Sequence, residues 1–297
     1  MDKPRADTPL PDPPPQGGRA RLRALVLAAL REDAAFADRT TRAIVPKNRQ
    51  AKAILLAKQD LVLCGLEVAE LAFRLLDPKI RFRPKAKDGQ RLKRGTVFAE
   101  LQGSARAILS AERVALNFLQ RLSGIATLTR RYVEAAKGSR AKILDTRKTT
   151  PGLRWLERYA VRAGGGFNHR FDLKSAAMAK DNHLVAAGSV SEALRRLKVA
   201  KIRVPVIVEV KNRRELEEAL KAGARHVLLD NMKPPQLREA VRIAAGRCRL
   251  EASGGVKLQT VGKIAKTGVD FISVGALTHS APAVDISLEI TAMLRSR

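Results

Sequence analysis

The sequence has few aromatic residues, few cysteines and few acidic residues for its length. Aromatic residues make up 4% of the 297 residues, which leaves few stacking platforms for single-stranded nucleic acid. Cys64 and Cys248 lie far apart and provide neither a disulfide framework nor the ligand spacing of a zinc site, so we expect a reducing compartment, the cytoplasm. No apolar run approaches the roughly 18 residues of a membrane span, and no membrane segment is expected.

Acidic residues are outnumbered about two to one, with 29 Asp and Glu against 57 Lys and Arg, and the formal net charge is +28. Such an excess raises the local concentration of any anion, from metabolite phosphates to nucleic acid. Nucleic acid is therefore one alternative partner. However, the chain has no zinc-finger spacing, no RNA-recognition aromatic motif and no long lysine block, and much of the excess is arginine spread along expected helices.

The chain divides by pattern into three parts. Residues 1–18 form a proline-rich leader that is expected to be disordered. An α+β region at 19–115 follows. A long helix is expected at about 110–122, across the end of this region, and a second helix at 125–137. After residue 140, short apolar strands alternate with helices at a spacing of about 20 residues up to residue 283, which predicts parallel βαβ units.

Polar residues recur where the apolar strands of the second region are expected to end. Glu209, Asp230 and Glu251 are 21 residues apart, and Ser273 follows 22 residues later. Unpaired carboxylates in a core are costly, so a regular repeat of this kind is difficult to explain as core. In an α/β barrel the carboxyl ends of the strands meet on the face that carries the active site. The repeat therefore predicts a barrel-type active-site rim.

Two glycine turns follow the last two expected strands, Ser253-Gly254-Gly255 and Ser273-Val274-Gly275. Backbone N–H groups in such turns can cradle a phosphate, and barrel phosphate sites recur after the final two strands. Carboxylates beside a phosphate site most simply hold Mg²⁺ or sugar hydroxyls.

A cation-rich segment lies between residues 145 and 183, and it carries Arg147, Lys148, His169, Arg170 and Lys180. Turn formers separate these cations, and three successive glycines allow a ligand to approach the backbone closely. Arginine forks and a compact lysine charge suit a small polyanion with carboxylate groups. The alternative interpretation is a solvated basic loop.

The ordered set of motifs resembles the quinolinate phosphoribosyltransferase family over residues 22–290. The segments that carry the resemblance are DRTT (38–41), AERVALN (111–117), LSGIAT (122–127), DTRKTTPGLR (145–154), GGGFNHR (164–170), KDNH (180–183), EVK (209–211), LDNM (229–232), EASGG (251–255) and SVGA (273–276). The resemblance implies an incomplete α/β barrel at 116–283 and an N-terminal open-faced α+β sandwich at 19–115, to which residues 284–297 are expected to return. It also implies a homodimer or higher homo-oligomer.

The activity implied by the resemblance is phosphoribosyl transfer to quinolinate with decarboxylation, with phosphoribosyl pyrophosphate as donor and Mg²⁺ as cofactor. Its implied quinolinate-binding residues are Arg147, His169, Arg170, Lys180 and, from the partner subunit, Arg113. Glu209, Asp230 and Lys148 are expected to engage ribose, pyrophosphate and metal, with Glu209 and Asp230 as metal ligands. The 5′-phosphate is expected at Ser253, Gly254, Gly255, Ser273 and Gly275.

This chain departs from the family pattern beside the cation-rich segment. Asp172 stands where glycine is usual, Ser175 where an acidic residue is usual, Ala179 where a larger aliphatic residue is usual, and Ala37 where glycine precedes Asp38. A related phosphoribosyltransferase-like protein associated with molybdate transport is the nearest alternative. Arg113, Arg147, Arg170 and Lys180 together favour quinolinate. A nonenzymatic nucleic-acid-binding protein is the alternative from another class.

Overall fold

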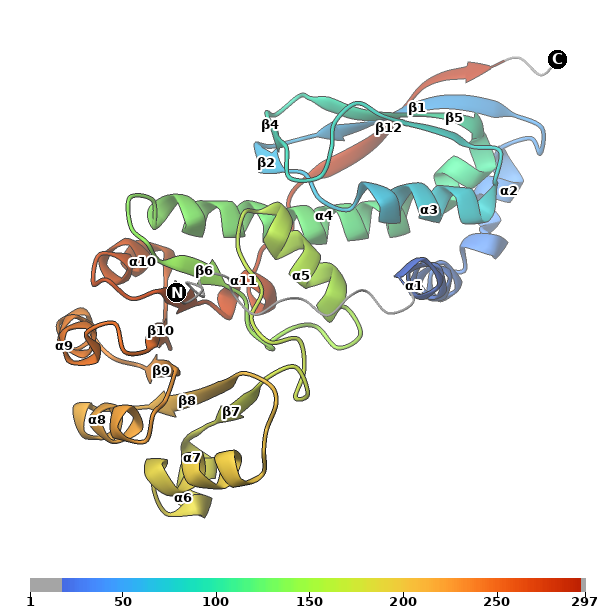
Figure 1. Cartoon of the computed structure of the whole chain (residues 1–297). Coiled ribbons are helices and arrows are strands. Elements are labelled where there is room, and N and C mark those ends of the chain that lie inside the picture. Colours follow the sequence, from blue (N-terminus) through green and yellow to red (C-terminus); the bar gives the residue numbers. More distant parts are fainter. Residues whose placement is uncertain (1–17, 295–297) are drawn as a thin grey trace, which may run out of the picture. The chain divides into compact units, whose positions relative to one another are not determined.

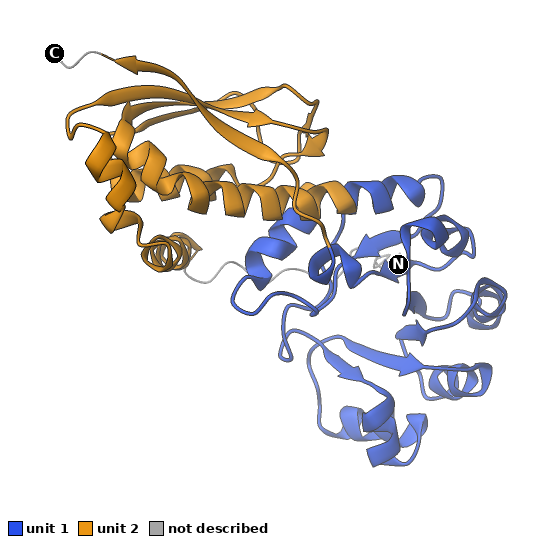
Figure 2. Cartoon of the chain, turned by 180° about the vertical axis from the view of Figure 1, so that it is seen from behind, with its two compact units in different colours: residues 1–14, 129–161, 165–280 blue, residues 15–128, 162–164, 281–297 orange. Residues whose placement is uncertain are grey.

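The computed structural model describes residues 18–294 as two compact units (Figure 2). Of these residues, 129–161 and 165–280 form the parallel-sheet unit, and 18–128, 162–164 and 281–294 form the antiparallel-sheet unit. The expected leader at 1–18 lies outside the described residues except for Gly18, which begins helix α1 (Gly18–Glu32). Among the described helices, none has the length and apolar character needed to cross a membrane.

The antiparallel-sheet unit is built on a four-stranded sheet in the order β12-β1-β5-β3. Its strands are β1 (Gln50–Ala57), β3 (Arg81–Pro84), β5 (Val97–Ser104) and β12 (Ile286–Leu294). Alternate residues of β1 are buried, because successive side chains of a strand point to opposite faces. On the buried face, Phe82 of β3 stacks on Phe73 of α3 (Leu66–Leu76), with ring centroids 6.3 Å apart. Lys52, Gln102 and Arg81, which are paired across three strands, are exposed, as in an open-faced sandwich.

Smaller elements complete this unit. They are η1 (Ala35–Ala37), α2 (Arg39–Ile44), and the paired strands β2 (Leu61–Val62) and β4 (Arg91–Leu92). Asp38 caps α2 by accepting a hydrogen bond from the Thr41 N–H at 2.9 Å. Strand β12 comes after the parallel-sheet unit in the sequence and pairs antiparallel with β1.

Helix α4 (Ala105–Ala135) runs unbroken for 31 residues. The prediction of separate helices at 110–122 and 125–137 was therefore wrong, and the predicted boundary between residues 115 and 116 falls inside this helix. Gly124 does not interrupt it. A Cβ atom there would lie 2.1 Å from the Pro282 carbonyl oxygen, so this glycine admits a close backbone contact.

The parallel-sheet unit contains a six-stranded parallel sheet in the order β6-β11-β10-β9-β8-β7 (Figure 1). Its strands are β6 (Lys142–Leu144), β7 (Ala177–Ala179), β8 (Val206–Val210), β9 (His226–Asp230), β10 (Arg249–Ser253) and β11 (Phe271–Ser273). The helices are α5 (Arg154–Ala163), α6 (Asp181–Ala187), α7 (Val190–Val199), α8 (Arg213–Lys221), α9 (Pro234–Ala244), α10 (Leu258–Ala265) and α11 (Ala276–His279). Most strands of this sheet are apolar and largely buried, as expected when helices cover a parallel sheet.

The sheet is open between β6 and β7, which are its edge strands. At the β6 edge, Phe167 forms a parallel bridge with Leu144, and the Phe167 N–H donates to the Ile143 carbonyl at 2.8 Å. The segment that carries the three glycines and the Asn-His-Arg run is thereby attached beside β6. The predicted fold class, an incomplete α/β barrel with an N-terminal open-faced α+β sandwich, is confirmed.

Candidate active site

The carboxyl ends of the six parallel strands form a rim on which most of the predicted site residues lie. In the spatial order of the strands these residues are Arg147 and Lys148 after β6, Ser273 and Gly275 at β11, Ser253, Gly254 and Gly255 at β10, Asp230 on β9, Glu209 on β8, and Lys180 after β7. Cations therefore follow both edge strands, the two glycine turns are adjacent, and the two carboxylates occupy neighbouring strands.

The two rim carboxylates affect one another. Burial and the negative charge of Asp230 raise the pKa of Glu209, against the opposing effects of Lys180 and the Asp181 N–H. Asp181 in turn forms a salt bridge with Lys211 at 3.2 Å. Two carboxylates that repel each other on neighbouring strands are a set of oxygen ligands that a divalent cation would stabilise. The residues present therefore fit Mg²⁺, although no group of three or more His, Cys, Asp or Glu with a metal-binding arrangement occurs between residues 18 and 294.

Glu251 is not on the rim, and the expectation that it ends its strand was wrong. It is the third residue of β10, pairs with Leu228 and Phe271, and is fully buried. Asp230 aligns with Ser253, so Glu251 lies two residues below the level of Asp230. Glu209 and Glu251 both align with Leu228, but only Glu251 is buried. The difference comes from the side chains that meet Glu251, which are His169, His226 and Ser273.

The first glycine turn requires glycine because of a close contact with the neighbouring strand end. Gly254 and Gly255 have φ angles of +92° and +57°. A Cβ atom on Gly254 would lie 2.2 Å from the side-chain oxygen of Asn231, which follows β9. Asn231 in turn donates to the Asp230 carboxylate at 2.8 Å. Asn231, which the sequence analysis left without a role, thus connects the turn to a rim carboxylate.

The second glycine turn is flanked by two basic side chains. A Cβ atom on Gly275 would lie 3.1 Å from the Lys148 side chain and 3.1 Å from His279 Nε2. The Thr278 hydroxyl also donates to the Lys148 carbonyl at 2.7 Å, which joins the loop after β6 to α11. His279 was missed by the sequence analysis. Its position four residues after the turn glycine is the signal that could have identified it.

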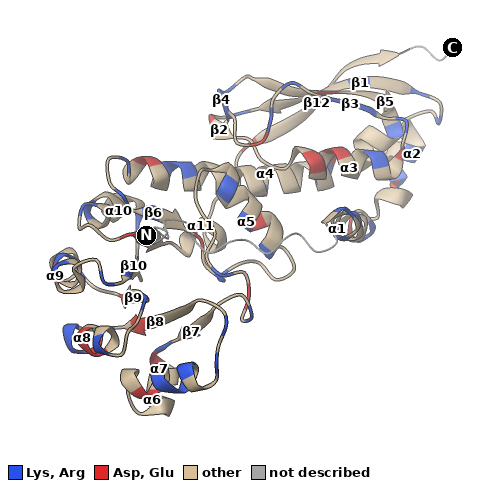
Figure 3. Ribbon diagram, in the orientation of Figure 1, with Lys and Arg blue, Asp and Glu red and all other residues tan. Residues whose placement is uncertain are grey.

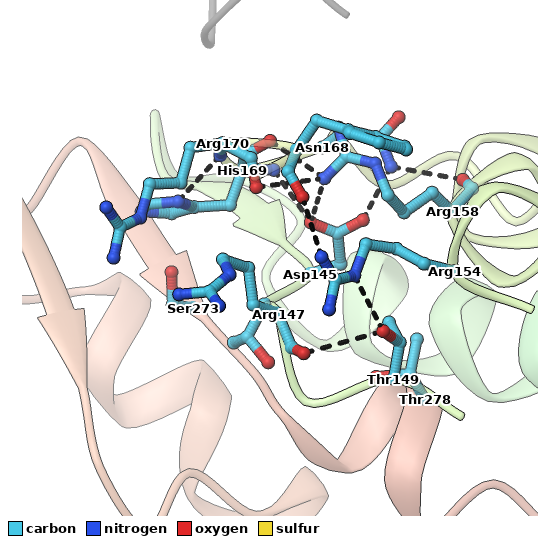
Figure 4. Close-up of polar contacts among 12 residues, drawn as sticks. Asp145, Arg147, Thr149, Arg154, Arg158, Asn168, His169, Arg170, Ser273 and Thr278 are labelled. Carbon is cyan, nitrogen blue, oxygen red and sulfur yellow. Dashed lines mark hydrogen bonds and ion pairs between the residues drawn. The ribbon is translucent and has the colours of Figure 1, made fainter. Parts of the chain in front are cut away.

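A buried carboxylate anchors the cation-rich segment. Asp145 accepts hydrogen bonds from Asn168 Nδ2 at 2.5 Å, from the His169 N–H at 2.7 Å and from Arg158 Nη1 at 3.3 Å (Figure 4). Burial raises the pKa of Asp145 to about 6, although Arg158 and the N–H donors oppose this shift. The sequence motif contained Asp145 and Asn168, but only the folded chain shows that they hold the segment in place.

Two guanidinium groups lie close together on this segment (Figure 4). Burial and the positive charge of Arg147 both lower the pKa of Arg170. Arg170 donates to the Ala176 carbonyl at 2.9 Å, whereas the Nε atom of Arg147 is buried without a hydrogen-bond partner. Two cations held together in this way favour a bound anion, and their planar forks suit carboxylates.

Both ring nitrogens of His169 are engaged within the chain. Nδ1 accepts a hydrogen bond from the Arg170 N–H at 2.7 Å, and Nε2 lies 3.2 Å from the Glu251 carboxylate. Because Nδ1 is an acceptor, the hydrogen of the neutral ring is on Nε2 and is donated to Glu251. The polar ring atoms of His169 are therefore directed at protein groups, and its predicted role in binding quinolinate stays a prediction.

The remaining predicted residues are exposed or lie beside the segment. Arg113 is an exposed residue of α4 in the antiparallel-sheet unit, and its place across a subunit interface stays a prediction. Lys180 is exposed at the start of α6. Of the departures from the family pattern, Asp172 and Ser175 bind one another: Asp172 Oδ1 accepts from the Ser175 N–H at 2.8 Å, and the Ser175 oxygen accepts from the Asp172 N–H at 3.2 Å.

Basic residues are spread over helices, strands and loops of both units (Figure 3). The feature that sets the rim apart is the combination of paired guanidinium groups, two glycine turns and two carboxylates on one sheet edge. These features define an α/β-barrel enzyme that acts on small polyanionic substrates.

Two family models match the chain: quinolinate phosphoribosyl transferase, N-terminal domain, over residues 38–123, and the C-terminal domain over residues 125–289. The chain is 44% identical over 261 residues to a probable nicotinate-nucleotide pyrophosphorylase (carboxylating) of Bacillus subtilis, covering 88% of this chain and 90% of that protein. It is 43% identical to quinolinate phosphoribosyltransferase (decarboxylating) 1b of Nicotiana tabacum, covering 93% and 84%. Its fold matches that of NadC from Streptococcus pyogenes with a TM-score of 0.88 at 44% identity, covering 96% and 99%.

The chain belongs to the quinolinate phosphoribosyltransferase family. Both the resemblance found in the sequence and the assignment as an enzyme are confirmed.

Proposed function

We propose that this chain transfers the phosphoribosyl group of phosphoribosyl pyrophosphate to quinolinate, with loss of CO₂, to give nicotinate mononucleotide and pyrophosphate for NAD biosynthesis. The observation that carries the proposal is the order of groups along the rim. An arginine pair for a dicarboxylate and two turns for phosphate stand on the same sheet edge as Glu209 and Asp230.

Quinolinate carries two carboxylates, and the cation-rich segment supplies its binding groups. Arg147 and Arg170 are close enough to repel one another, so each gains when an anion binds between them. Lys180 adds a third positive charge from the end of β7. We further propose that the chain works as a homodimer or higher homo-oligomer in which Arg113 of one subunit completes the quinolinate site of another.

The donor substrate fits the middle of the rim. The backbone N–H groups of Gly254, Gly255 and Gly275 would bind the 5′-phosphate, with Ser253 beside them. Lys148 lies against Gly275 and would bind pyrophosphate. Glu209 and Asp230 would hold Mg²⁺, which neutralises the leaving pyrophosphate when bound.

The reaction needs little chemistry from protein side chains. As the bond between the anomeric carbon and pyrophosphate breaks, positive charge develops on the ribose, and the Glu209 and Asp230 carboxylates stabilise it. The pyridine nitrogen forms the new bond to the anomeric carbon and becomes cationic. The positive charge on that nitrogen stabilises the electron pair that remains on the adjacent ring carbon when its carboxylate leaves as CO₂, and this carbon then takes a proton from water. The protein mainly positions two polyanions and offsets their mutual repulsion.

We place the enzyme in the cytoplasm, since both cysteines are free thiols and Cys64 is buried where it would take no part in a disulfide.

The test is formation of nicotinate mononucleotide from quinolinate, phosphoribosyl pyrophosphate and Mg²⁺, with nicotinate as a parallel substrate. Turnover with quinolinate alone, abolished in Glu209→Ala and Asp230→Ala, is the expected result. Absence of product from a folded wild-type enzyme would refute the substrate assignment and favour the molybdate-associated relative. Nucleic-acid binding that falls steeply with salt and persists in both variants would favour the nonenzymatic alternative.

A further inference from the structure

A fully buried carboxylate lies inside the parallel-sheet unit, below the rim. Glu251 is 0% exposed and sits two residues before the end of β10, between Leu228 of β9 and Phe271 of β11. A buried charge needs partners that compensate for its loss of water. The partners of Glu251 therefore show what this position does.

Three side chains from three different elements meet at this carboxylate. His226 of β9 lies with Nε2 2.9 Å from Oε2, and His169 of the segment beside β6 lies with Nε2 3.2 Å away. The Ser273 hydroxyl at the end of β11 donates to Oε1. Burial raises the pKa of Glu251, but His169 and His226 lower it by more, so the carboxylate is ionised.

Two of these partners, His169 and Ser273, connect Glu251 to the two halves of the proposed substrate site. His169 accepts the Arg170 N–H on its other ring nitrogen, so Glu251 fixes the imidazole that fixes the Arg170 backbone. The Glu251 charge also acts directly on the Arg170 guanidinium, whose pKa it raises against the larger effect of burial. Ser273 is the last residue of β11 and precedes Gly275 by two positions. Its hydroxyl, held inward by Glu251, fixes the start of the second glycine turn.

We propose that Glu251 is a positioning residue that connects Arg170 to the second glycine turn at Gly275. One buried carboxylate then holds both the quinolinate-binding and the phosphate-binding half of the site in position. The inference rests on the proposed roles of Arg170 and Gly275. Under this inference Ser273 and His169 act through Glu251 and touch neither substrate, because the Ser273 hydroxyl and both His169 ring nitrogens are engaged within the chain.

Glu251→Gln and Ser273→Ala, alone and combined, test this inference through the KM of each substrate. Glu251→Gln keeps the size of the side chain and removes its charge, and we expect both KM values to rise about tenfold, with kcat changed by less than about threefold. Ser273→Ala removes only the hydrogen bond between Glu251 and the start of the second glycine turn. The KM for phosphoribosyl pyrophosphate should therefore rise, and the KM for quinolinate should not. In the double variant the KM for phosphoribosyl pyrophosphate stays at the Glu251→Gln value, because both changes break one connection.

Thr267→Val is the matched control for loss of a buried hydroxyl. Thr267 is 5% exposed and donates to the Ile264 carbonyl at 2.7 Å at the end of α10, so its loss should leave both KM values unchanged. A lower unfolding temperature for Glu251→Gln with both KM values unchanged, or a change in only one of them, would overturn the proposal. If Glu251→Gln does not fold, an unchanged KM for phosphoribosyl pyrophosphate in Ser273→Ala overturns it alone. A folded wild-type enzyme without turnover would instead refute the proposed function.

Discussion

In the first glycine turn, two adjacent glycines allow the effect of a close contact to be measured separately from the effect of the backbone conformation. Gly254 and Gly255 both have positive φ angles, +92° and +57°, so alanine at either position adopts a conformation that costs roughly 1–2 kcal/mol. The surroundings differ. A Cβ atom on Gly255 meets nothing within 4 Å, whereas one on Gly254 would lie 2.2 Å from Asn231 Oδ1 and 2.9 Å from the Asn231 backbone nitrogen.

The expected difference follows from this contact. Gly255→Ala should lower the free energy of unfolding by roughly 1–2 kcal/mol. Gly254→Ala should cost roughly 1–3 kcal/mol more, because the Asn231 side chain must move and release the Asp230 carboxylate, which it contacts at 2.8 Å. Urea unfolding of the two variants without ligands measures this difference. The KM for phosphoribosyl pyrophosphate should also rise in Gly254→Ala as Asp230 loses its partner.

Asn231→Gly provides the control. Asn231 itself has a φ angle of +55°, so glycine fits its backbone and removes the side chain that the new methyl group would meet. The double variant Gly254→Ala with Asn231→Gly should recover part of the lost unfolding free energy. The reasoning would be refuted if Gly254→Ala and Gly255→Ala unfold within about 0.5 kcal/mol of one another, or if the second change gives no recovery.

Three further outcomes are expected. Arg147→Met should raise the KM for quinolinate more than tenfold without loss of unfolding free energy, since it removes the charge that opposes Arg170; a clear loss of stability in urea would contradict this. Asp230→Asn should lower the pKa of Glu209, because it removes a neighbouring negative charge. The measurement is a ¹³C NMR titration of the Glu209 carboxyl, and an unchanged pKa would contradict the expected coupling. The pKa of Asp145 is about 6 when folded against 3.8 when unfolded, so its ionised form opposes folding above pH 6, and this opposition is relieved as the pH falls toward 4. Relative to Asp145→Asn, the wild type should therefore gain up to roughly 3 kcal/mol between pH 7 and pH 4 in urea unfolding, and a difference that does not depend on pH would contradict the assignment.

The sequence predicted which residues lie near the carboxyl ends of the strands, but not which of them are buried. Glu209 and Asp230 could be placed at strand ends because each closes a short apolar run, and that pattern is local. Glu251 has the same spacing, but it is buried because His169, His226 and Ser273 meet it from other elements, and a local pattern does not encode such contacts. Helix α4 was divided in the prediction at Gly124. The contact that accounts for this glycine comes from Pro282, more than 150 residues away in the sequence. In each case the error came from a long-range contact that overrode a local signal.

The basic residues of this chain differ from one another in their surroundings. On α7 and α8, arginines are matched by acids one turn away: Arg195 and Arg196 both pair with Glu192, and Arg213 pairs with Glu217. Such exposed pairs contribute little and are compatible with a solvated surface. Arg147 and Arg170 are instead brought together on loops, where burial and the positive charge of Arg147 lower the pKa of Arg170. Two guanidinium groups held together favour a bound anion, so the charge that we propose for substrate binding is a small part of the net excess of +28, which does not by itself identify it.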